Sequence, residues 1–192
     1  MGSLLPRVAV FALLLASTGA SGAGGRHHAK AGVTASLLLS YEVTNDQDTR
    51  HDVWFVDGQG RTFEFSRIGG ADPLAQALRT ESVGVRDAAA LITASRPLPP
   101  ALEPAELQRA QALVAAAEHS MLWTHRRKDP CKFGVNVTIR GYLFVKNRPA
   151  TLVALRETSC GWLVDENLSP EAQELIEWVY RLSGKPRQRL RR

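Results

Sequence analysis

Residues 52–68 read DVWFVDGQGRTFEFSRI, and this stretch decides the fold. Two runs in which apolar and polar residues alternate flank the sequence Asp57-Gly58-Gln59-Gly60, a pattern typical of a β-hairpin. Phe63 and Phe65 of the second run fall on one side, and Trp54 and Val56 of the first run are predicted to supply the matching apolar face. The stretch therefore predicts two antiparallel strands that share one buried face.

The flanking sequence extends this hairpin. Residues 33–43 are rich in apolar residues and predict a third strand, which completes an antiparallel meander. Prolines within residues 97–100 are predicted to break the chain. Capping residues, prolines at helix starts and apolar residues at helical spacing predict three helices. These begin at Asp72-Pro73, run over residues 85–94, and run from Pro104 to about Ser120.

The second half of the chain repeats this plan. Three segments are predicted as strands of a second meander, over residues 133–145, 151–157 and 161–165. Ser169-Pro170-Glu171 is predicted to open a last helix, which Gly184 ends. We therefore expect an α+β fold, with an antiparallel sheet of five or six strands in two meanders. Three or four helices pack with this sheet in a single domain over residues 33–184.

The first residues predict export. Arg7 precedes the apolar run Val8–Ala16, and small residues follow from Ser17 onward. This order is typical of a cleaved signal peptide, here expected over residues 1–23, with a disordered Gly/Ala-rich leader over 24–32. The run is too short to span a bilayer, and no later segment is long and apolar enough to form a transmembrane anchor. A secreted or periplasmic protein is expected.

Cys131 and Cys160 are the two cysteines of the chain, and an oxidising compartment predicts a disulfide between them. The predicted strand positions place the two cysteines too far apart for this disulfide. If a turn at residues 147–150 sets the register, Cys160 lies level with about residue 137, on the order of 20 Å from Cys131 along a straight strand. Three resolutions stay open: a fold-back around Gly134, a bulge near Gly141, or no bridge. The bridge remains the expectation.

Positive charge is concentrated in two short segments. The formal net charge is +5, and without Arg7 and the C-terminal tail over residues 185–192 the chain is close to neutral. A near-neutral body argues against nucleic-acid binding, which needs basic residues over a folded face. An anionic surface is the expected contact, at about 1 kcal/mol per basic residue; a plain solubilising tail is the alternative. The predicted contact residues are Arg126, Arg127, Lys128, Lys185, Arg187, Arg189, Arg191 and Arg192.

No catalytic, cofactor or metal motif is recognisable. His119 and His125 flank Trp123, but a zinc site needs at least three protein ligands, and the neighbouring sequence supplies no third. We therefore predict no catalytic, cofactor-binding or metal-ligating residue. The expected function is that of an exported, non-catalytic binding or inhibitor-like module, whose partner is an anionic surface or an envelope protein. The alternatives are a small envelope hydrolase using carboxylates or histidines in a cleft, and a structural component that forms stable oligomers.

Overall fold

In a computed structural model, the chain divides into two compact units, Met1–Val33 and Thr34–Arg192. The described residues all belong to the second unit. They are 35–45, 50–68, 78, 83–117, 122–126, 134–145, 148–160 and 163–185. The predicted signal peptide and leader, and the tail from residue 186 onward, lie outside them and stay predictions.

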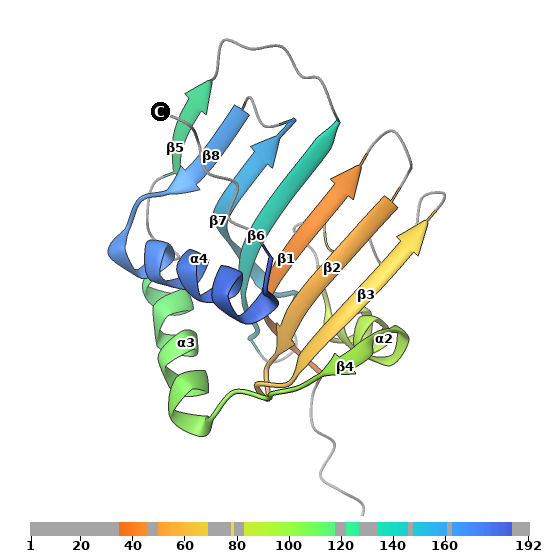
Figure 1. Cartoon of the computed structure of the whole chain (residues 1–192). Helices are drawn as coiled ribbons and strands as arrows, with labels where there is room; N and C mark the ends of the chain where they lie inside the picture. The colour runs from red at the N-terminus through yellow and green to blue at the C-terminus, as the bar shows by residue number, and fades with distance from the viewer. Residues whose placement is uncertain are drawn as a thin grey trace, which may run out of the picture. The chain divides into compact units, whose positions relative to one another are not determined.

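The eight described strands form a single antiparallel sheet (Figure 1). Its spatial order is β4-β3-β2-β1-β6-β7-β8-β5. The two predicted meanders are β1-β2-β3 and β6-β7-β8, joined where β1 pairs with β6. The strands span Leu37–Asn45 (β1), Arg50–Asp57 (β2), Thr62–Ile68 (β3), Arg96–Leu98 (β4), Leu122–Arg126 (β5), Val135–Leu143 (β6), Thr151–Ser159 (β7) and Leu163–Asn167 (β8).

The predicted count of five or six strands is wrong, and both additional strands lie at the edges of the sheet. The predicted break around Pro97 is instead the strand β4, because an edge strand tolerates the missing N–H of a proline. The other edge strand, β5, lacks the alternation of a half-buried strand, because all five of its residues are exposed. Neither edge therefore carries a periodic signal.

Three helices occur within the described residues, and they cover both faces of the sheet (Figure 1). They are α2 (Val85–Ala94), α3 (Pro104–Ala117) and α4 (Pro170–Ser183). α3 and α4 share one apolar core with the sheet, and α2 shares a second core with the other face. α4 begins as predicted, with the Ser169 hydroxyl accepting the N–H of Ala172, and Gly184 ends it in a left-handed conformation. The helix predicted from Asp72 lies outside the described residues, apart from Leu78.

The turn between β2 and β3 is longer than predicted. The N–H of Asp57 donates to the carbonyl of Arg61 over 2.9 Å, so the connection closes one residue later than the sequence pattern indicates. The buried Asp57 carboxylate accepts the N–H groups of Gln59 and Arg61, each over 2.9 Å. Gly60 adopts a φ of 80°, which a side chain would disfavour.

This additional turn residue shifts the pairing of β2 with β3 by one residue, so different side chains share a face. Phe55 lies opposite Phe63, and their rings stack with centroids 5.1 Å apart. Trp54 lies opposite Glu64, on the other face. The predicted common face of Trp54 with Phe63 and Phe65 is therefore wrong, because a shift of one residue moves a side chain across the sheet. The apolar residues of β2 are consecutive, so their side chains alternate between the two cores.

The register of the second meander changes the expected position of Cys160. The connection between β6 and β7 is longer than four residues, and a bulge lies between Ile139 and Arg140. Val137 pairs with Thr158, so the strand direction places Cys160 level with about Val135 instead of 137. The backbone N–H of Cys160 donates to Asn136 over 3.0 Å. Cys131 lies outside the described residues, so the bridge stays a prediction.

Candidate functional site

The two edges of the sheet differ in their capacity to accept another strand. β4 has three residues, contains Pro97 and is followed by Pro99-Pro100. Short length and proline are two devices by which proteins block a sheet edge. β5 has five residues, Leu122–Arg126, contains no proline and is exposed throughout. We call these residues the open edge, since no other described strand pairs with their outer side.

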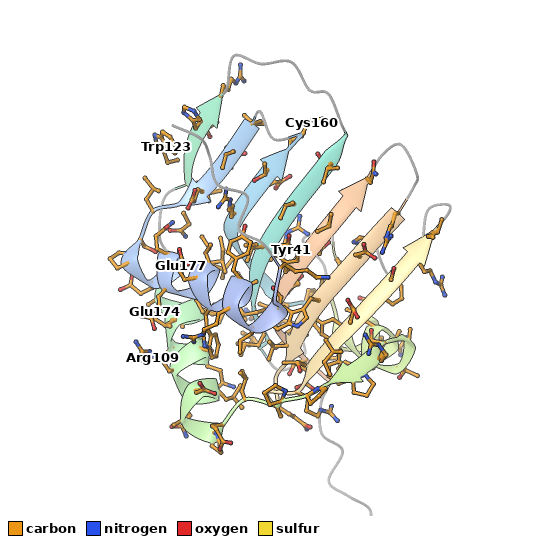
Figure 2. The ribbon with its side chains drawn as sticks, in the orientation of Figure 1. Tyr41, Arg109, Trp123, Cys160, Glu174 and Glu177 are labelled. Carbon is orange, nitrogen blue, oxygen red and sulfur yellow. The ribbon has the colours of Figure 1, made fainter. Side chains whose placement is uncertain are left out.

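The open edge presents aromatic side chains on one face of the sheet. The ring of Trp123 stacks on that of His125, with centroids 5.1 Å apart and planes 16° apart. Trp123 lies opposite Glu166 on β8, Glu166 lies opposite Arg156 on β7, and Arg156 lies opposite Ile139 on β6. Ile139 belongs to the core that α3 and α4 share with the sheet, so Trp123 lies on the face that these helices cover. Trp123 is nevertheless 46 % exposed, and Figure 2 shows it at the β5 edge of the sheet.

The opposite face of the open edge carries Leu122, Thr124 and Arg126. The Thr124 hydroxyl donates to the Asp165 carboxylate on β8. Leu122 is 46 % exposed, and Leu168, which follows β8, is 55 % exposed. Large apolar side chains exposed beside an unpaired edge mark a site for pairing with another chain.

A hydrogen bond between α3 and β8 helps to position β5. The Asn167 side-chain amide on β8 donates over 3.1 Å to the carbonyl of Ala117, the last residue of α3. β5 then pairs with β8 along its whole length, from Leu122 opposite Asn167 to Arg126 opposite Leu163. Among the described strands, β8 alone pairs with the edge strand, on its inner side.

The predicted basic contact residues do not gather at one described place. Arg126 is exposed at the end of β5, whereas Lys185 follows α4 and lies 3.6 Å from the Glu64 carboxylate on β3. β3 and β5 are six strand spacings apart, a separation of about 29 Å at about 4.8 Å per spacing. The remaining predicted residues lie outside the described residues: Arg127, Lys128, Arg187, Arg189, Arg191 and Arg192.

A buried polar cluster lies on the face of the sheet that α2 packs against. The Glu42 carboxylate accepts a hydrogen bond from Ser40 over 3.1 Å and one from Arg140 over 3.4 Å. Ser40 also shares a hydrogen bond of 2.9 Å with the Tyr142 hydroxyl. His51 Nε2 lies 3.5 Å from Glu42, yet neither ring nitrogen of His51 has a hydrogen-bond partner among the described residues.

This cluster has the residue types of a hydrolytic site, but it lacks exposure. Glu42 is 3 % exposed and His51 is 6 % exposed, so a substrate does not reach them in this conformation. Burial, and next to it the Glu42 charge, raises the pKa of Tyr142, which keeps this hydroxyl a neutral hydrogen-bonding group. Arg140 also donates to the carbonyl of Leu78, and so ties that segment to β6. The geometry favours a structural role, in which a polar network fixes how the strands pack.

A second polar group lies under α4 on the opposite face. Arg156 on β7 is buried directly opposite Glu166 on β8, whose carboxylate accepts a hydrogen bond from Gln173 of α4 over 2.9 Å. Tyr41 and Tyr180 meet edge to face beside Arg156, with ring centroids 5.8 Å apart. Burial raises the pKa of Tyr41 to about 12, and the charge of Arg156 partly opposes this rise. These groups anchor α4 to the sheet.

A groove of about 420 Å³ runs between α3 and α4. Its charged walls include Arg109 and Glu174, which form an ion pair of 2.6 Å. Figure 2 shows these two residues on α3 and α4, with Glu177 farther along α4. Trp178 supplies an aromatic part of the lining. Charges of both signs already pair across this groove, so it has no clear preference for a ligand charge.

The site residues found here carry no sequence motif. The open edge is defined by exposure and by its place in the sheet, and the buried cluster unites residues from β1, β2 and β6. His125, one of the two histidines tested in the sequence, lies on the open edge, and His119 lies outside the described residues. The described residues contain no group of three metal-ligating side chains, and none of their helices is long and apolar enough to cross a membrane. No family model, curated protein or solved structure matches the chain.

Proposed function

We propose that the protein is an exported, non-catalytic binding module, and that its open edge pairs with an extended segment of another polypeptide. The observation that carries this proposal is the difference between the two sheet edges. β4 is short and contains Pro97, whereas β5 is longer, free of proline and exposed in every residue. Strand addition to such an edge takes its affinity from main-chain hydrogen bonds and its specificity from alternating side chains.

The side chains of the open edge suit this mode of binding. Trp123 and His125 present a flat aromatic surface on one face, and tryptophan is enriched among the residues that dominate binding energy. On the other face, Leu122 and Arg126 lie at the two ends of the strand and offer a bound segment one apolar and one cationic side chain. The cation at the end of the strand favours an acidic group in the partner.

The basic tail extends this proposal. Retention on an anionic surface would raise the local concentration of the protein near envelope partners, at about 1 kcal/mol per basic residue close to the surface. Lys185 is already near an acid, Glu64, so the residues beyond it are the ones expected to contact that surface. Changing Arg187, Arg189, Arg191 and Arg192 together to Gln tests this extension, which requires weaker retention on anionic vesicles with unchanged folding.

Capture from a solubilised envelope extract tests the strand-addition function. The mature protein is compared with Trp123→Lys, which places a guarding charge on the open edge. Val145→Lys is the matched control, because Val145 is also exposed, at 54 %, but lies outside β5. We expect Trp123→Lys to lose the captured partner and Val145→Lys to retain it. Equal capture by both variants would contradict the proposed site.

The hydrolase alternative would depend on Glu42 and His51. Their burial speaks against it, and a substrate screen of Glu42→Gln beside the unchanged protein separates the two functions. Hydrolysis that disappears in this variant, while its far-ultraviolet circular dichroism is retained, would favour the enzyme over the binding module.

A further inference from the structure

We infer that the polypeptide segment bound by the open edge is the open edge of a second copy of this chain, paired antiparallel about a two-fold axis at Thr124. This inference rests on the proposed strand addition and names its partner.

The register follows from symmetry. In an antiparallel pair of identical strands related by a two-fold axis, the numbers of two facing residues always add up to the same value. Only one value of this sum gives every residue of β5 a facing residue in β5 of the second copy. It places Thr124 opposite its own counterpart. Trp123 then lies opposite His125 of the other copy, and Leu122 lies opposite Arg126.

The opposing side chains are compatible in this register. The stacked pair of Trp123 and His125 meets the same pair from the second copy on one face, so the aromatic row continues across the two-fold axis. Aromatic cross-strand pairs and threonine pairs are both stabilising in antiparallel sheets. Arg126 faces an apolar side chain, so no like charges lie directly opposite each other.

The opposite edge closes the assembly at two copies. Pairing of β5 with β4 of another copy would be a head-to-tail contact, which can propagate into a fibre. Pro97 and the three-residue length of β4 disfavour that contact. Pairing of β5 with β5 uses each open edge once and leaves two blocked edges outside. The two sheets then join into one continuous sheet.

Cysteine cross-linking tests the register directly. Thr124→Cys places two thiols opposite each other, where Cα atoms in an antiparallel pair are about 4.5–5.5 Å apart, within the reach of a disulfide. Leu122→Cys is the matched control on the same exposed strand. In the proposed register its thiols are about 14 Å apart along the strand, too far to bridge. The full mature chain is oxidised mildly, and dimers are read on a non-reducing gel.

We expect a covalent dimer from Thr124→Cys, none from Leu122→Cys, and a dimer when Leu122→Cys is mixed with Arg126→Cys. Cross-linking of both single variants, or of neither, would overturn the register. Sedimentation equilibrium adds a measurement without cysteines. Leu122→Glu should lower the dissociation constant of the dimer and Leu122→Lys should raise it, each by about 2- to 30-fold for two symmetry-related charge pairs.

The failure of this inference is distinguishable from the failure of the proposed function. A monomer in sedimentation, with no cross-link at position 124, overturns the second copy as the partner. If Trp123→Lys still loses its captured protein in that case, strand addition stands with a different polypeptide. If Trp123→Lys changes neither capture nor the oligomeric state, strand addition fails as well.

Discussion

The turn between β2 and β3 offers a sharp test of how the fold is specified, through the substitution Asp57→Ala. The carboxylate of Asp57 is 2 % exposed and accepts two backbone N–H groups over 2.9 Å each, from Gln59 and Arg61. It also forms an ion pair of 2.6 Å with the Arg61 side chain, which is 52 % exposed. These bonds stabilise the longer turn, and the length of this turn determines which side chains of β2 and β3 lie on the same face of the sheet.

The magnitude follows from the two backbone bonds. A hydrogen bond to a charged acceptor contributes about 1.5–3 kcal/mol, and the lower value applies because Gln59 and Arg61 are exposed enough for water to replace part of the loss. The half-exposed ion pair adds at most a small increment. We therefore expect Asp57→Ala to lower the free energy of unfolding by about 3 kcal/mol. Asp57→Asn keeps an acceptor oxygen and should cost about 1 kcal/mol.

Urea unfolding followed by tryptophan fluorescence measures both variants. A loss of about 3 kcal/mol corresponds to a midpoint lower by about 1–2 M urea at slopes typical of a domain of this size. Equal effects of the alanine and asparagine variants, or a loss below about 1 kcal/mol for alanine, would refute the reasoning that the carboxylate holds this turn.

Three further predictions concern the rest of the described fold. Burial, and next to it the neighbouring Tyr180, raises the pKa of Tyr41 to about 12, so the neutral phenol stabilises the fold fully below pH ~10 and this stabilisation is lost as the pH rises toward ~12. Tyr41→Phe should therefore flatten the alkaline loss of stability by about 2 kcal/mol in unfolding curves collected across that pH range; an unchanged slope would contradict the shift. A Cβ at Gly141 would lie 2.9 Å from Val114 of α3, so Gly141→Ala should lower the free energy of unfolding by about 1–3 kcal/mol in urea, and a neutral effect would show that α3 yields. The predicted Cys131–Cys160 bridge requires that the unfolded protein bind a thiol reagent only after reduction, with a stability loss on reduction of about 3–4 kcal/mol; rapid labelling without reductant would disprove it.

The parts of the fold that depend on local signals could be predicted from the sequence. α2 has the bounds expected from its apolar spacing, and α4 begins at the serine cap and proline that mark its start. The faces of the first hairpin could not be predicted in the same way. They depend on the length of the turn, which the hydrogen bonds of Asp57 set and which apolar periodicity does not report.

The candidate site could not be predicted, because it depends on position in the sheet. Leu122–Arg126 shows no alternation that distinguishes a strand from a loop, and only its pairing with β8 makes it an edge. The buried cluster likewise joins Ser40 to Tyr142, which are 102 residues apart in the chain. Tertiary pairing creates both features, and short sequence windows contain neither.

Hydrogen exchange at residues 122–126 tests most directly whether β5 is the binding edge. Amide exchange of the protein without its predicted signal peptide is followed by mass spectrometry at low and high protein concentration, and again with the solubilised envelope extract. Strand addition predicts that amides on the outer side of Leu122–Arg126 become protected in at least one of these conditions, while the β4 segment Arg96–Leu98 is unchanged. Exchange at Leu122–Arg126 that stays fast in every condition, with protection arising elsewhere, would contradict the assignment of β5 as the binding edge.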